Sequence, residues 1–159
     1  LGDVYKRQVI IKPEDSICMI EVDDKGENYR RWLRKLQNYH WNIKGKNFFT
    51  IHSKLEEYYN EVNEQIDEIA EHILSLGYQP LGTMKDYLQI SKISEAENEK
   101  ICEDDVFTNV MQDMQIILDR LLTIKKLSDQ NNEYMTSSLC DEYMLEYSKK
   151  IWMIKQMKQ

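Results

Sequence analysis

Residues 38–80 read NYHWNIKGKNFFTIHSKLEEYYNEVNEQIDEIAEHILSLGYQP and contain all three histidines of the 159-residue chain. Apolar side chains recur here at steps of three and four residues for about eight turns, the period of a helix with one buried face. The pattern predicts one helix about 45 Å long that begins after Asn47 and ends at Gly77 and Pro80. Its apolar positions are Phe48, Ile51, Leu55, Tyr58, Tyr59, Val62, Ile66, Ile69, Ile73 and Leu76.

The rest of the chain repeats this helical period. Apolar spacing predicts a first helix over residues 27–44, a third over 103–128 and a fourth from residue 136 onward. A capping-box pattern predicts a short helix over residues 83–90. With only 5 glycines and 2 prolines, the composition disfavours a many-stranded sheet. We therefore predict an all-α fold, an antiparallel four-helix bundle with a short extra helix between the second and third helices.

The N-terminal part of the sequence lacks this period. Residues 9–26 show no apolar repeat and are predicted to be irregular, and we interpret residues 1–8 as non-native sequence. The chain is long enough for one core but not for two. This predicts an irregular segment, 1–26, followed by one bundle domain, 27–159.

Charge and cysteine content restrict the possible partners. The net charge of −7 disfavours attraction to nucleic acid or to an anionic membrane surface. The three cysteines, Cys18, Cys102 and Cys140, form no C-x-x-C pair, so we expect a reducing, cytoplasmic setting rather than a disulfide framework. No apolar run approaches the roughly 20 residues that span a bilayer.

Two rows of polar side chains run along the surface of the long helix. The first steps by four, three and four residues on the side opposite the apolar stripe, and we predict that it is a solvated face. The second borders the apolar stripe. The first row is Glu57, Glu61, Glu64 and Glu68, and the second is His52, Glu56, Asn63, Asp67 and Glu71.

The second row contains two pairs at i,i+4 spacing, His52 with Glu56 and Asp67 with Glu71. This spacing brings two side chains together on a helix surface. Imidazole with carboxylate is a donor set for iron or zinc, and the excess of carboxylate without sulfur suits iron or manganese better.

The two pairs cannot share a metal ion within one chain, because the nineteen residues from His52 to Glu71 cover about 28 Å of helix. Two copies of the helix packed antiparallel across a two-fold axis would bring His52 to Glu71 and Glu56 to Asp67. Both pairs of numbers sum to 123, so one axis near residues 61–62 satisfies both and predicts an isologous dimer with two sites. His40 would add a nitrogen ligand. From spacing alone, unconnected surface charges remain an equal alternative.

The motif H-W-N-x-x-G-x-x-F-F-x-x-H at residues 40–52, followed by D-x-x-A-E at 67–71 and P-L-G-T-x-K-x-Y-L at 80–88, resembles the Dps family, the miniferritins of the ferritin-like superfamily. The resemblance is close over residues 27–91 and looser from there to residues 151–153. It implies a hollow dodecamer of two-fold dimers, with ferroxidase centres at the dimer interfaces.

The resemblance also implies the ligands and the reaction. His40, His52 and Glu56 would come from one subunit and Asp67 and Glu71 from its partner, with iron as the metal. Trp41 would be either a sink for stray oxidising equivalents beside the centre or a packing residue. Fe(II) would be oxidised, preferentially by hydrogen peroxide, and stored as Fe(III). The alternative is a non-catalytic, nucleoid-associated or structural cage with vestigial metal sites, although we do not expect DNA binding.

The sequence departs from the family pattern at three positions. Glu56 stands where many members have Asp, and His72 stands where Arg is common. Ser138 replaces an Asp that helps to line the pore for iron entry, and Asp141 or Glu142 could substitute for it.

Overall fold

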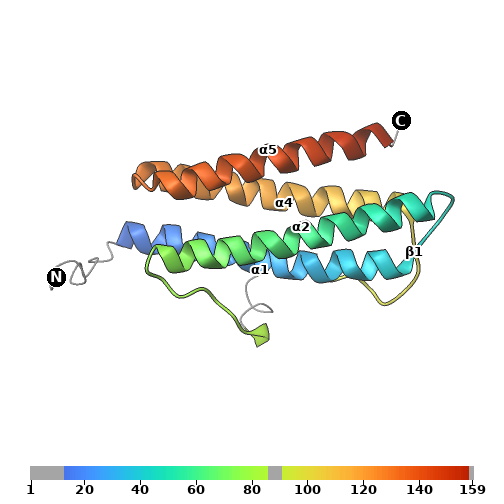
Figure 1. Ribbon diagram of the computed structural model, residues 1–159, viewed down its shortest axis with the longest axis horizontal. Helices are drawn as coiled ribbons and strands as arrows, with labels where there is room; N and C mark the ends of the chain where they lie inside the picture. The colour runs from blue at the N-terminus through green and yellow to red at the C-terminus, as the bar shows by residue number, and fades with distance from the viewer. Residues whose placement is uncertain (1–12, 86–90, 158–159) are drawn as a thin grey trace.

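Four long helices form the molecule, and the computed structural model describes residues 13–85 and 91–157 of it. They are α1 (Pro13–Asn42), α2 (Phe48–Ser75), α4 (Glu103–Gln130) and α5 (Tyr134–Met157), with two-residue strands β1 (Ile43–Lys44) and β2 (Ile101–Cys102). Helix α1 packs antiparallel along α2, and α4 packs antiparallel along α5 (Figure 1). The predicted all-α four-helix bundle is confirmed.

The long connection from α2 to α4 runs back along the bundle, so that α2 and α4 point the same way (Figure 1). It is fixed to α1 by side chains: Arg30 Nη1 donates to the Leu81 carbonyl oxygen at 2.8 Å, and the Lys92 amide donates to Asn28 Oδ1 at 2.8 Å. The predicted short helix over 83–90 falls mainly outside the described residues, which contain a helical turn only at 84–85.

Helix α1 begins at Pro13, so the prediction that residues 9–26 are irregular is wrong for 13–26, and the helix crosses the predicted boundary at residue 27. Proline is favoured at the first position of a helix, and Glu14 and Asp15 suit the positive end of its dipole. Gly26 does not end the helix, since one helical glycine costs only about 1 kcal/mol. Residues 9–12 lie outside the described part of the chain.

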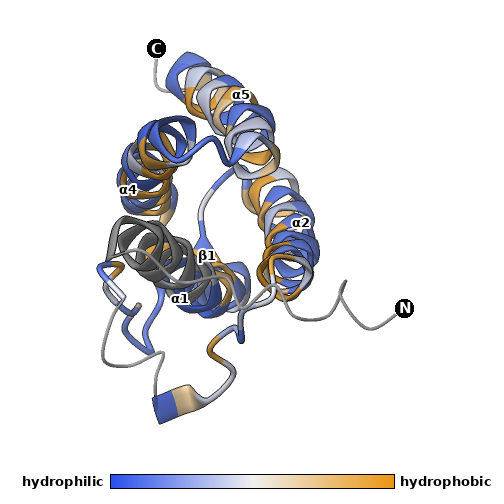
Figure 2. Cartoon of the chain, turned by 90° about the vertical axis from the view of Figure 1, so that its left-hand side faces the viewer, coloured by the Kyte–Doolittle hydropathy of each residue, from blue (hydrophilic) through white to orange (hydrophobic). Residues whose placement is uncertain are grey.

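The core occupies the space between the helices, with apolar residues turned inward (Figure 2). All four long helices contribute to the core. Of the apolar positions predicted for the long helix, most are buried, and Phe48, Tyr59, Ile66 and Leu76 are half-buried. The largest fully buried side chains are Trp32, Tyr29, Tyr147, Leu36, Ile51, Ile73, Ile93, Met114, Ile117, Leu121 and Ile124. No helix in the described ranges is long and apolar enough to cross a membrane.

The first acidic row of α2 was predicted to be a solvated face, but two of its four residues also contact α5. Glu61 pairs with Lys150 of α5, and Glu68 accepts a hydrogen bond from the Tyr143 hydroxyl of α5. Glu57 pairs with Lys54 of its own helix, and Glu64 is exposed. Glu68 is exposed as predicted, but both it and Glu61 also contact α5, because α5 lies along that side of α2.

The turn between α1 and α2 is held from outside by the first residue of α4. Glu103 Oε1 accepts a hydrogen bond from the Asn47 amide at 2.6 Å, and Glu103 Oε2 accepts one from Asn47 Nδ2 at 2.9 Å. Asn47 occupies the predicted N-cap position but makes no side-chain capping bond there. Parallel pairing of β1 with β2 holds the same turn. Both contacts tie the start of α4 to the α1–α2 turn.

Gly45 is required in this turn for two reasons. Its φ of +152° is one that other residues rarely adopt, and a Cβ there would lie 2.1 Å from Glu103 Oε1. We predict that Gly45→Ala lowers the free energy of unfolding by about 2 kcal/mol. Gly82→Ala is the matched control, since a Cβ at Gly82 meets nothing within 4 Å. Urea denaturation at equal protein concentration measures both, and equal stability of the two variants would contradict this account of the turn.

Candidate metal-binding site

Two histidine side chains stack at the end of the bundle where α1 passes into α2. His40 lies in the last turn of α1 and His52 near the start of α2. Their ring centroids are 3.6 Å apart, and the ring planes differ by 17°. Nδ1 of His40 lies 2.8 Å from the backbone oxygen of His52, and Nδ1 of His52 lies 2.8 Å from the backbone oxygen of His40. Each imidazole is therefore oriented by the backbone of the other.

This reciprocal pairing determines which ring nitrogen can bind a metal. A backbone carbonyl only accepts hydrogen bonds, so Nδ1 of each ring carries the proton. A neutral imidazole protonated at Nδ1 has its lone pair on Nε2. Histidine ligands in metal sites commonly have this arrangement, with one ring nitrogen donating to a carbonyl and the other binding the metal. In both His40 and His52, Nε2 is thus the nitrogen that could bind a metal.

Aromatic side chains enclose the histidine pair. Phe48 stacks on the His52 ring at 4.9 Å, and the Tyr59 ring meets His40 edge to face at 5.4 Å and 82°. His40 is only 8% exposed, whereas His52 is half-buried. The enclosure limits rotation of the rings and leaves the His52 side of the pair facing outward.

The predicted carboxylate ligands are exposed and lie on the outside of α2. Glu56 follows His52 by one turn, whereas Asp67 and Glu71 lie further along the same unbroken helix. At 1.5 Å per residue, Asp67 is about 22 Å from His52 along the axis, and Glu71 about 28 Å. Within the described ranges, no three His, Cys, Asp or Glu side chains gather in a group that could hold a metal ion. A single chain brings the two histidines together but not the five predicted ligands.

Trp41 follows His40 and is 61% exposed. Within one chain it does not pack between the helices, which was one of its two predicted roles. Its backbone oxygen accepts a hydrogen bond from Lys100 Nζ at 3.4 Å, which connects this end of α1 to the segment before β2.

Two residues that depart from the family pattern, His72 and Ser138, have different surroundings in the structure. His72 Nε2 lies 2.8 Å from the Thr136 hydroxyl at the start of α5. Ser138 is exposed, and of its two possible substitutes Asp141 is bound by Lys125 at 2.9 Å, whereas Glu142 is exposed. Lys125 also pairs with Asp129 at 3.7 Å, so one lysine is shared by two carboxylates.

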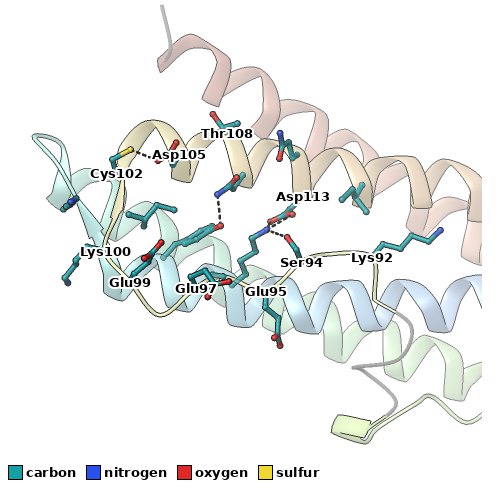
Figure 3. Close-up of a pocket in the computed structure, with 18 residues that line it drawn as sticks. Lys92, Ser94, Glu95, Glu97, Glu99, Lys100, Cys102, Asp105, Thr108 and Asp113 are labelled. Atoms are coloured by element: carbon teal, nitrogen blue, oxygen red, sulfur yellow. Dashed lines mark hydrogen bonds and ion pairs between the residues drawn. The ribbon is translucent and has the colours of Figure 1, made fainter.

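A cavity of about 540 Å³ lies between α1, α4 and the segment before β2 (Figure 3). None of the five predicted ligands lines it. On its wall, Lys35 Nζ binds the Asp113 carboxylate at 2.7 Å and the Ser94 hydroxyl at 3.4 Å, with Lys35 and Asp113 both buried. Burial raises the pKa of Asp113, and Lys35 opposes that rise. We interpret the pair as a polar link between α1 and α4.

Sequence reasoning missed two residues at this end of the bundle. Tyr59 was assigned only to the apolar stripe, although it follows Glu56 at the i,i+3 spacing at which helical side chains meet. Glu103 was predicted only as the start of the third helix, and nothing local links it to Asn47, 56 residues away.

Comparison with known proteins agrees with this architecture. Residues 33–159 match the family described as Ferritin-like domain. The chain is 41% identical over 121 residues to DNA protection during starvation protein 2 of Bacillus anthracis, covering 76% of this chain and 82% of that protein.

Two solved structures have the same fold. The Vibrio cholerae Dps protein, described as a member of a broad superfamily of ferritin-like diiron-carboxylate proteins, superposes with a TM-score of 0.87 at 29% identity, over 92% of this chain and 91% of that one. A Bacillus brevis Dps protein superposes with a TM-score of 0.89 at 27% identity, over 93% and 99%.

These matches define the protein class as ferritin-like four-helix bundles. Within that class, the chain belongs to the Dps family.

The histidine pairing predicts a specific tautomer. In mildly alkaline buffer, His40 and His52 should both be protonated at Nδ1 and unprotonated at Nε2. ¹⁵N solid-state NMR of histidine-labelled protein, with single His→Gln variants for assignment, reports the protonated nitrogen directly. A proton on Nε2 of either ring would contradict the pairing described above.

Proposed function

We propose that this protein is a ferroxidase that oxidises Fe(II) at sites shared between subunits and stores Fe(III) inside a hollow homo-oligomer. The observation that carries the proposal is the histidine pair, in which two backbone carbonyls hold both Nδ1 atoms and leave both Nε2 atoms for a metal. Membership of the ferritin-like family supports iron storage in general.

The complete ligand set requires a second subunit. We propose that His40, His52 and Glu56 of one chain face Asp67 and Glu71 of its partner across a two-fold axis near residues 61–62. The unbroken course of α2 and the exposure of its three carboxylates support this arrangement, because a partner helix can reach them. Each dimer would then contain two identical sites.

The proposed ligands suit the chemistry. Carboxylate and imidazole donors favour iron, and carboxylate oxygens stabilise the Fe(III) product. Two Fe(II) ions, each losing one electron, reduce one molecule of hydrogen peroxide without releasing hydroxyl radical. We propose peroxide as the preferred oxidant and protection from oxidative stress as the outcome. We propose that Trp41, which follows His40 in the sequence and is exposed, donates electrons to stray oxidants.

Further assembly is expected from the surface of α5, and we propose that the dimers form a dodecamer. Large apolar side chains on α5 are exposed in the single chain, including Leu145 at 75% and Trp152 at 59%. Exposed apolar groups of this size commonly mark protein–protein contacts. The solved relatives are named Dps proteins, which supports a homo-oligomer.

We place the protein in the cytoplasm, a setting that suits the free thiols of Cys102 and Cys140. A non-catalytic, nucleoid-associated cage is the less favoured function. Relatives are named for DNA protection, but a net charge of −7 opposes binding to phosphate backbones.

A mixing experiment tests whether the sites are shared between subunits. His52→Ala and Asp67→Ala should each abolish rapid Fe(II) oxidation by peroxide. When the two variants are unfolded and refolded together, each mixed dimer regains one intact site, so about a quarter of wild-type activity should return. Stopped-flow absorbance of Fe(III) formation measures the rates.

Glu57→Ala serves as the control, since Glu57 pairs with Lys54 and belongs to the other acidic row. Its rate should equal that of the wild type. If the mixed oligomer stays inactive while each variant alone assembles normally, the sites are not shared. Unchanged oxidation in both single variants would refute the ferroxidase proposal itself.

A further inference from the structure

Two large apolar side chains are exposed on α2, one near each end of the helix. Phe49 is 84% exposed and Leu74 is 52% exposed, whereas the other large apolar residues of α2 are buried or half-buried. A single exposed apolar residue is common on a protein surface. The position of these two relative to the other residues of α2 therefore decides whether they mark a contact.

Both side chains lie on the face of α2 that carries the proposed carboxylate ligands. Phe49, Glu56, Asp67 and Leu74 are separated by seven, eleven and seven residues. At about 100° per residue, all four point within about 20° of one another around the helix axis. An exposed apolar residue thus stands at each end of one outward-facing polar stripe.

The proposed two-fold axis relates Phe49 to Leu74. Their numbers sum to 123, as do those of the two proposed ligand pairs. An isologous interface places each residue opposite its symmetry mate, so Phe49 of one chain would meet Leu74 of the partner subunit at both ends of the interface. The ligand spacing located this axis without Phe49 and Leu74, so the apolar pair is an independent observation.

The same symmetry pairs small or uncharged side chains between these positions. It places Ser53 opposite Ala70, and Asn60 opposite Asn63 beside the axis. Ser53, Asn60 and Asn63 are exposed in the single chain, and Ala70 is half-buried. Small side chains allow two helices to approach closely, and two amides can hydrogen-bond to each other. The outer face of α2 is therefore complementary to the same face of a second copy.

We propose that the outer face of α2 docks on the same face of a second copy of this chain, and that contacts between Phe49 and Leu74 of the partner subunit set the register of the two helices. Phe49 lies one turn before His52, and its ring is 5.5 Å from that of Phe48, which stacks on His52 at 4.9 Å. The register that joins Phe49 to Leu74 is the one that brings His52 to the partner's Glu71. The inference rests on the proposed function for the identity of the metal ligands.

The apolar contacts have a further consequence for association. Glu56, Asp67 and Glu71 of both chains would come close together at this interface and repel one another in the absence of metal. Burial of Phe49 against Leu74 at both ends would offset this repulsion, so the dimer should form before any metal binds.

The variant Phe49→Glu tests the contact by placing a carboxylate against Leu74 and Glu71 of the partner subunit. We expect the full-length, metal-free protein to self-associate about thirtyfold more weakly, the effect of losing an apolar anchor of an interface. Leu74→Lys should also weaken association. Sedimentation velocity over a dilution series measures this. Because both side chains are exposed in the single chain, circular dichroism should show unchanged helix content.

The double variant with Phe49→Glu and Leu74→Lys tests whether the two residues face each other. Each introduced carboxylate would lie opposite an introduced ammonium group of the partner subunit. Association should recover at least about tenfold relative to Phe49→Glu alone, because the two substitutions are coupled only if the side chains are in contact.

Thr50→Glu is the matched control. Thr50 is exposed and adjacent to Phe49, but it points about 100° away around the helix. The variant adds the same charge outside the proposed interface, so it should associate like the wild type.

Two results would overturn the proposal. Wild-type association of Phe49→Glu would show that Phe49 faces solvent or another surface, and a double variant no stronger than Phe49→Glu would show that Phe49 and Leu74 do not meet.

These results are separable from the proposed function, because association is measured without metal. If the double variant recovers but wild-type protein oxidises Fe(II) no faster than His52→Ala, the interface stands and the ferroxidase proposal fails. If Phe49→Glu stays assembled while His52→Ala loses the activity, only the interface is refuted.

Discussion

The reciprocal hydrogen bonds between His40 and His52 join the end of α1 to the start of α2. Each ring donates to the backbone of the other, so neither imidazole can turn without breaking a bond at the opposite helix. The pairing needs a short and fixed turn between the two helices. Gly45 permits that turn, and Glu103 holds it by binding Asn47 from the start of α4. The orientation of two candidate ligands therefore depends on contacts from three of the four long helices.

Helix α2 faces three different environments. One face is buried in the core, and the side towards α5 carries Glu61 and Glu68, which bind Lys150 and Tyr143. The outer margin carries His52, Glu56, Asp67 and Glu71. Adjacent residues such as Asp67 and Glu68 therefore have different surroundings, because successive positions on a helix point about 100° apart. A carboxylate at the edge of an apolar stripe can belong to either neighbouring surface, and only the packing of α5 distinguishes them.

In the single chain the candidate ligands lie in two separate places on α2 and at the end of α1. The histidines are enclosed by Phe48 and Tyr59, whereas Asp67 and Glu71 stand in solvent about two-thirds of a helix length away. Exposed carboxylates on an acidic surface repel one another, and a bound cation would relieve that repulsion. If the proposed sites are shared, metal binding and subunit association would be linked, since each site would take donors from both chains.

The periodicity of apolar residues was sufficient to predict four helices, their buried faces and the end of α2, because burial of one face imposes a 3.6-residue period on the sequence itself. The spacing of His52, Glu56, Asp67 and Glu71 was likewise sufficient to show that one chain cannot gather them. The start of α1 at Pro13 was not predictable in this way, because residues 13–26 have no apolar period. The protonated nitrogen of each histidine, the Glu103–Asn47 contact and the partners of Glu61 and Glu68 were decided by tertiary structure alone. Each depends on groups brought together from distant parts of the chain or across a turn, and local sequence carries no record of which distant group will be the partner.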